Sequence, residues 1–231
     1  WFEVVSGADG ISLVYRACAI APEDGFFNDI AALPGTGGFL VTQMYPRPEG
    51  ILGELPLLKA IIGLDTGYLV RWTPDGGFEK VEGTDVAFAN GVAISEDGST
   101  VYMNEYFGAV QVYDTANFDT LYTLPINHGD NLAWSDRGLL LNASHEGAFS
   151  ESARCMQESD YNCRDNFQVH SYDPVSRRLC LLMDYSDKQI PTATVALGVK
   201  DHLYLGTHSG DRITRVPWPG RLSCEVIDAA P

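Results

Sequence analysis

The chain has 231 residues, of which 45% are hydrophobic and 20% charged, and this composition is typical of a globular domain. Its formal net charge of -16 argues against a nucleic-acid partner, because no basic face is available to neutralise phosphates. The sequence contains no run of roughly 18 apolar residues, so we predict no transmembrane helix. The acidic excess is interpreted mainly as an aid to solubility, with attraction for cations as the alternative.

The first twenty residues carry two strand-like runs, 1–6 and 11–20, which Gly7-Ala8-Asp9-Gly10 joins in a hairpin pattern. Neither a starting Met nor a basic leader precedes Trp1, and no signal peptide is visible. A chain that begins in this way is expected to be processed or cut from a longer one.

Two strands are predicted from Asn28 to Tyr45, split by a glycine-rich turn, and an apolar segment at helical spacing follows at 51–64. Pro56 should limit this segment to a bent or two-part helix. We expect the helix to pack over a face of the domain; a lid or a membrane-touching element is the alternative, and membrane contact is the less favoured of these.

The next elements are pairs and quartets of short strands separated by turn residues. Strands at 68–73 and 78–81 flank Pro74-Asp75-Gly76-Gly77, and four strands fill 90–124. A third unit starts at Asp130 and contains a polar insertion at 147–166. A fourth unit is predicted from Thr192 to about Asp228.

Four of these units begin alike when they are aligned: NDIAALPGTGGFLVTQMY, NGVAISEDGSTVYMNEY, DNLAWSDRGLLLNASHE and, without the polar pair, ATVALGVKDHLYLGTHSG. Self-similarity at this period is the signature of a β-propeller, whose blades each send an innermost strand to a central channel. Short oxygen-bearing side chains at the same end of successive inner strands should therefore converge on one axis. Such oxygens are hard ligands of the kind that calcium or magnesium takes, although turn residues of the same types are the ordinary alternative.

The five cysteines are an odd number, so at least one is unpaired or pairs outside the chain. Cys18 and Cys180 lie in apolar strand patterns and are interpreted as small buried hydrophobic residues. Cys155 and Cys163 flank a polar loop, where a disulfide is one interpretation. Such a bond would favour a periplasmic or secreted location.

The histidines receive separate interpretations. His128 lies either at the pocket or in an exposed loop, and His145 ends a second strand and is a pocket candidate. Ser144 and His145 do not form a catalytic pair, because adjacent strand residues point to opposite faces. His208, in the last unit, is a further candidate, whereas His170 and His202 are interpreted as ordinary strand and turn residues.

The order and spacing of these motifs resemble the six-bladed propellers of the paraoxonase, gluconolactonase and strictosidine-synthase-like group, and especially its calcium-dependent lactonases and arylesterases. The resemblance runs from Phe26 to Trp218. It rests on the NDI pair, the inserted helix after the second strand, NGVAIS-EDG-STVYMNEY, DNL followed by SH, and the closing LYLGT. It implies one all-β domain over 1–231 that supplies about four and a half blades and one short helix. The N-terminal one to two blades, or a partner segment, would be missing.

The resemblance also implies a set of site residues. The ligands of a catalytic calcium would be Asn28, Asn90, Asp130 and Asn131, and Asp29 would bind a second, structural calcium. His145 would lie where a pocket-lining histidine occurs in the family. His128, which precedes the Gly129-Asp130 turn, is the second catalytic candidate by its position alone. The family's remaining carboxylate ligands and its proposed histidine base pair would lie upstream of Trp1.

We therefore predict a calcium-dependent hydrolase of lactones or aryl esters, in which the metal polarises the substrate carbonyl. Two alternatives remain: a strictosidine-synthase-like lyase that uses a carboxylate base, and a non-catalytic propeller that binds a ligand or a protein.

Overall fold

The computed structural model of the protein describes residues 2–7, 10–50, 53, 55–147 and 164–228. Within these residues, the chain forms four antiparallel sheets that are arranged as successive propeller blades, one separate hairpin and one short helix. The predicted all-β propeller is thus confirmed. Among the described residues, no helix is both long and apolar enough to cross a membrane.

The elements follow the repeats of the sequence. The hairpin is β1 (Phe2–Gly7) and β2 (Gly10–Tyr15). Blade 1 contains β3 (Phe27–Ala32), β4 (Phe39–Gln43), β5 (Tyr68–Thr73) and β6 (Gly77–Lys80), with α1 (Leu55–Ile61) between β4 and β5. Blade 2 contains β7 (Ala89–Ile94), β8 (Thr100–Glu105), β9 (Val110–Asp114) and β10 (Thr120–Leu124).

Blade 3 contains β11 (Gly129–Trp134), β12 (Leu140–Glu146), β13 (Asn166–Asp173), β14 (Arg178–Tyr185) and β18 (Ser223–Val226), and blade 4 contains β15 (Val195–Val199), β16 (His202–Gly206) and β17 (Thr214–Pro217). The innermost strands β3, β7, β11 and β15 contact one another in sequence order. The start of each aligned repeat therefore lies beside the start of the next.

Three hydrophobic cores hold neighbouring blades together, one at each junction. Leu40 and Leu69 of blade 1 share a core with Met103 of blade 2, and Val112 of blade 2 shares one with Leu140 of blade 3. Phe167 and Leu203 belong to the core between blades 3 and 4. Alternate residues of each strand point to opposite sheet faces, so both faces of blades 2 and 3 are buried in these cores.

The two end blades each leave one sheet face open. Along β3 the residues alternate between partly buried and exposed, and the Ile30 side chain is 60% exposed. On β15, Leu197 and Val199 are exposed in the same way. By contrast, every residue of β7 is buried between two blades.

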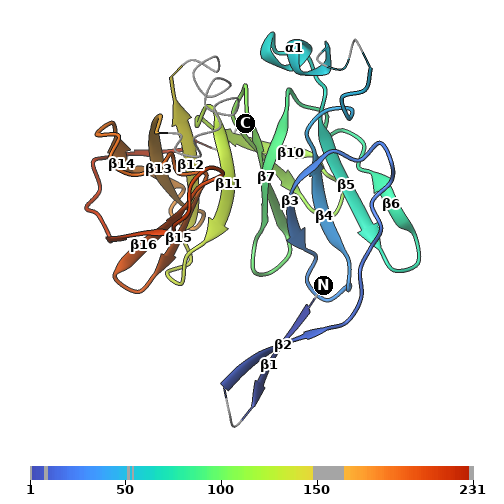
Figure 1. Ribbon diagram of the computed structural model, residues 1–231, viewed down its shortest axis with the longest axis horizontal. Helices are drawn as coiled ribbons and strands as arrows, with labels where there is room; N and C mark the ends of the chain where they lie inside the picture. Colours follow the sequence, from blue (N-terminus) through green and yellow to red (C-terminus); the bar gives the residue numbers. More distant parts are fainter. Residues whose placement is uncertain (1, 8–9, 51–52, 54, 148–163, 229–231) are drawn as a thin grey trace.

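The predicted N-terminal hairpin is confirmed, and it extends away from the blades at the end opposite α1 (Figure 1). Its cross-strand pairs Phe2–Tyr15 and Val4–Leu13 lie on one face and are exposed. Among the described residues, this hairpin forms a two-stranded sheet of its own.

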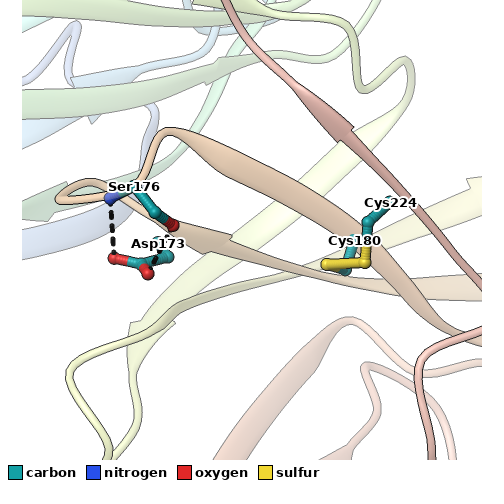
Figure 2. The surroundings of a disulfide bond; sticks show 4 residues. All are labelled: Asp173, Ser176, Cys180 and Cys224. Carbon is teal, nitrogen blue, oxygen red and sulfur yellow. Dashed lines mark hydrogen bonds between the residues drawn. A yellow bond between two sulfur atoms is a disulfide. The ribbon is translucent and has the colours of Figure 1, made fainter.

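The C-terminal strand corrects two predictions. Instead of completing the fourth unit, β18 pairs with β14 of blade 3. Cys180 is buried as predicted, yet it is bonded to Cys224, which lies directly opposite it in the strand register (Figure 2). The pairing was missed because Cys224 lies on a strand that crosses back from the next unit. Cys18 is a free, exposed cysteine and not a buried one. The Cys155–Cys163 pair lies outside the described residues.

Figure 2 also shows the turn that joins β13 to β14, where the Asp173 carboxylate accepts hydrogen bonds from the backbone and hydroxyl of Ser176. The Asp-Pro sequence suits this turn, because aspartate side chains satisfy backbone donors in turns. The turn joins β13 to β14 in the register that pairs Asp173 with Arg178.

Candidate functional site

The polar pairs of the first three repeats lie at β-bulges. Register shifts occur between Phe27 and Ile30, between Ala89 and Val92, and between Gly129 and Leu132. A bulge leaves residues outside the regular ladder and redirects their side chains. The pairing of β15 with β16, where the repeat has lost its polar pair, is regular from Val195 onward. The polar pair and the bulge therefore occur together.

The bulges open onto one cavity of about 430 Å³. It is lined by four of the predicted ligands, two histidines, a threonine and a set of apolar and aromatic residues: Asn28, Asn90, Asp130, Asn131, His145, His208, Thr194, Phe26, Met44, Tyr45, Leu57, Phe88 and Tyr106. The structure thus brings Asn28, Asn90, Asp130 and Asn131 together from three blades, as the repeat alignment predicted.

Asn90 is buried, and its side-chain oxygen has no hydrogen-bond partner among the described residues. Next to it, Gly91 packs so tightly against the backbone of Asp130 and Asn131 that no Cβ would fit there. The backbone amide of Asn131 in turn donates a hydrogen bond to the carbonyl of Thr194, just before β15 of the next blade, at 2.9 Å. The close approach of β7 to β11 therefore places Asn90 beside Asp130.

Asp130 supplies the carboxylate of this group. Burial raises its pKa to about 7, the charge of Asp29 adds to the rise, and a hydrogen bond with Asn90 opposes it. One Asp130 oxygen lies 3.4 Å from Nε2 of His145. A buried carboxylate with so few partners in the protein is a strong candidate for a cation ligand.

Two buried asparagine side chains support the backbone of Asp130 at its bulge. Asn142 on β12 donates to the side-chain oxygen of Asn104 on β8 at 2.7 Å, and Asn104 donates to the backbone carbonyl of Asp130. Both asparagines are at most 2% exposed. This connection between blades 2 and 3 fixes the backbone at the point where the Asp130 side chain leaves it.

The histidines occupy different positions around the cavity. His145 and His208 line it, with ring centroids 6.3 Å apart. His128 is not a lining residue; its ring packs against Tyr106 and Phe107. Burial lowers the pKa of His145 to about 4, and the charges of His208 and His128 contribute to this shift.

Asp29 is placed apart from the other predicted ligands. Its two carboxylate oxygens accept backbone hydrogen bonds from Ile30 at 2.8 Å and from Val92 at 2.9 Å. The second bond connects blade 1 to blade 2. Burial raises the pKa of Asp29, and the two backbone donors oppose the rise. Its role toward a second ion stays a prediction.

One wall of the cavity is aromatic. Ring contacts link Phe26 to Tyr45, Tyr45 to Phe88, and Phe88 to Tyr106, with centroid distances of 5.1, 5.3 and 5.4 Å. Leu57 of α1 borders the same cavity. The helix, which we predicted to pack over a face of the domain, therefore borders the cavity, although several of its apolar side chains are exposed.

The donor set fits a hard cation. Among the described residues, no three His, Cys, Asp or Glu side chains form a group that could hold a metal. The candidate ligands are instead the Asp130 carboxylate and the amides of Asn28, Asn90 and Asn131, which offer oxygen atoms of the type that calcium prefers. The unpartnered oxygen of Asn90 is the feature that such an ion would explain.

Sequence reasoning missed the buried supports and the aromatic wall. Asn104 and Asn142 are polar residues within otherwise apolar strands, MNEY and LNASH, and this irregularity was the available signal. Phe88 has a positive φ of 67°, which no sequence pattern predicted. In the sequence, Tyr106 looks like an ordinary aromatic residue at a strand end, because its contact with His145 on β12 of the next blade depends on the fold.

No family model matches the chain, and no curated protein matches it in sequence. In structure it is similar to a gluconolactonase from Xanthomonas campestris, with a TM-score of 0.56 and 13% identity over 88% of this chain. The chain spans 63% of that protein's length. This likeness shows the β-propeller fold.

Two further structures resemble the chain less closely. One is a chain from a nidogen–laminin complex, with a TM-score of 0.47 and 9% identity over 97% of this chain and 89% of that one. The other is the computationally designed protein Ika4, with a TM-score of 0.48 and 12% identity over 86% of this chain and 95% of that one.

Proposed function

We propose that the protein is a calcium-dependent hydrolase of lactones or aryl esters, with its reaction site in the cavity that residues of all four blades line. The observation that carries the proposal is the repeated bulge, which directs Asn28, Asn90, Asp130 and Asn131 into one cavity. The likeness in fold to a gluconolactonase supports it.

In this proposal, Asn28, Asn90, Asp130 and Asn131 hold the ion. A bound calcium ion supplies Lewis-acid polarisation of a carbonyl oxygen. Neutral amide ligands leave most of the ionic charge uncancelled, while Asp130 contributes the negative charge needed for affinity. Calcium takes six to eight oxygens, so water and substrate oxygens would complete the shell.

The protein's own residues bind and orient the substrate. The apolar part of a lactone or aryl ester rests on the aromatic wall of Phe26, Tyr45, Phe88 and Tyr106. This wall also excludes water from one side of the cavity, which strengthens electrostatic interactions inside it. His145 acts on the site through its contact with Asp130.

We further propose a periplasmic or secreted location. The disulfide between Cys180 and Cys224 supports it, because such bonds persist in oxidising compartments.

The test is hydrolysis of phenyl acetate and of short lactones, measured with calcium and again with a chelator. We expect activity that requires calcium and falls in Asn90→Ala. The matched control is Asn117→Ala, at an exposed turn outside the cavity. Equal hydrolysis with and without calcium would refute the metal mechanism. Calcium binding without hydrolysis of either substrate class would favour a non-catalytic binding propeller.

A further inference from the structure

A hydrogen bond joins two buried side chains from neighbouring blades at the cavity. The Tyr106 hydroxyl, just after β8, lies 3.0 Å from Nδ1 of His145 on β12. Tyr106 is 5% exposed and His145 8%. On the other side of the imidazole, Nε2 faces an oxygen of Asp130 at 3.4 Å. Phenol, imidazole and carboxylate therefore form a line that ends at the candidate metal ligand.

A chain of backbone hydrogen bonds holds the same residues in place. The Tyr106 amide donates to Phe88 at 2.9 Å, the His128 amide to Tyr106 at 3.0 Å, and the His145 amide to His128 at 3.0 Å. Phe88 and His128 have φ values of 67° and 52°, in the left-handed region that residues other than glycine rarely adopt. This conformation is strained for residues other than glycine and persists only where the surroundings impose it. The backbone on both sides of Tyr106 is thus fixed.

The chemistry of the phenol–imidazole pair favours one arrangement of protons. A phenol hydroxyl is a stronger hydrogen-bond donor than an imidazole N–H, and an unprotonated imidazole nitrogen is a stronger acceptor than a phenol oxygen. The Tyr106 hydroxyl therefore donates to Nδ1, which leaves the proton of the neutral imidazole on Nε2. The 3.4 Å contact between Nε2 and Asp130 is not a hydrogen bond, and Nε2 has no hydrogen-bond partner among the described residues, so this contact does not select the tautomer by itself.

We propose that Tyr106 is a positioning residue: it fixes His145 as the Nε2–H tautomer and thereby orients the Asp130 carboxylate in the cavity. Removing a residue that holds a metal ligand in its orientation typically lowers metal affinity or activity by about 10–100-fold. The importance of Tyr106 for turnover rests on the proposed hydrolase function. The tautomer of His145 does not depend on that function and can be measured separately.

The experiment is a long-range proton–nitrogen NMR correlation on the 231-residue chain labelled with 15N-histidine, at pH 8.5 in the presence of a chelator. His145 is assigned by the signal lost in His145→Gln. We expect Nε2 to be the protonated nitrogen in the wild-type protein. In Tyr106→Phe, which keeps the ring and removes the hydroxyl, we expect a mixture of both tautomers.

The control is Tyr113→Phe, which removes a hydroxyl from another buried tyrosine on β9, outside the cavity. It should leave the His145 signals unchanged. A wild-type His145 protonated at Nδ1 would overturn the proposal without any variant. An unchanged Nε2–H tautomer in a folded Tyr106→Phe would overturn it as well.

A second readout separates this inference from the proposed function. If the protein hydrolyses lactones, Tyr106→Phe should lower kcat about tenfold with little change in KM, because the substrate contact of the ring is kept. If it hydrolyses none, the proposed function fails, and the NMR result still decides the role of Tyr106.

Discussion

Asn90 illustrates how a single residue can be costly to the fold and useful to the site. Leaving a buried polar group without a partner destabilises a protein by about 1–3 kcal/mol. The oxygen of Asn90 is in this situation, whereas the asparagines behind it, Asn104 and Asn142, are joined by a hydrogen bond. A cation in the cavity would satisfy the Asn90 oxygen.

His170 on β13 provides a second residue-scale case, outside the cavity. Its Nδ1 has no hydrogen-bond partner among the described residues, and burial lowers its pKa to about 4, from 6.5. The unfolded chain therefore binds this proton more readily between pH 6.5 and 4. The stability that neutral His170 contributes is fully present above this window and is lost as the pH falls through it.

We predict that the wild-type protein loses about 1 kcal/mol more unfolding free energy between pH 7 and pH 5.5 than His170→Gln does. Urea denaturation at the two pH values measures this difference. His202→Gln, a partly exposed histidine on blade 4, is the control and should behave as wild type. Parallel pH dependence in wild type and His170→Gln would show that the pKa of His170 is the same in the folded and the unfolded protein.

At the scale of elements, β18 is the least expected strand. It is four residues long, all of them exposed, and it pairs along one edge of blade 3. Such a strand has little apolar area to bury, although Ile227 beyond it packs against the core of blades 2 and 3. The disulfide to Cys180 is therefore expected to be its main attachment.

We predict that Cys180→Ala with Cys224→Ala destabilises the chain by about 2–4 kcal/mol, since the bond closes a loop of 44 residues. Hydrogen exchange should show faster exchange at β18 and along the β14 edge. Cys18→Ser, at a free and exposed cysteine, should leave both stability and exchange unchanged. Unaltered protection of β18 in the double variant would show that packing alone holds this strand.

The helix α1 offers a test of substrate contact. Leu57 lines the cavity, whereas Leu58 is 55% exposed on the same helix. If the proposed activity is present, Leu57→Ser should raise KM for long-chain lactones more than for short ones, because a long apolar chain loses more buried surface. Leu58→Ser, the matched control, should change neither value. A uniform loss for all chain lengths, with a lower Tm, would mean that α1 has a structural role only.

The elements also show what the sequence could and could not predict. The hairpin, the four-stranded blade at 90–124 and the shared cavity of the candidate ligands followed from local sequence patterns; these candidates are Asn28, Asn90, Asp130 and Asn131. The β14–β18 pairing and the Tyr106–His145 bond join distant segments. No local pattern encodes such contacts, because they depend on how neighbouring blades are placed.

For the whole molecule, the cores between blades explain why the site is preorganised. Each blade shares a hydrophobic core with the next, so the inner strands cannot shift independently. The candidate ligands come from blades 1, 2 and 3, and Asp29 adds a direct bond between the first two. An ion held by all three blades would stabilise the folded chain by linkage. The stabilisation would be about 2.7 kcal/mol at a free ion concentration of a hundred times Kd.

Calcium titration by calorimetry tests the central claim most directly, using the wild-type chain, Asp130→Asn and Asn117→Ala. We predict one cavity site in the wild type, the same affinity in Asn117→Ala, and a loss of at least tenfold in Asp130→Asn. The substitution keeps the shape of the side chain and removes the charge that faces the cavity. Absence of calcium binding by the wild type, or equal affinity in Asp130→Asn, would contradict a metal site at this cavity.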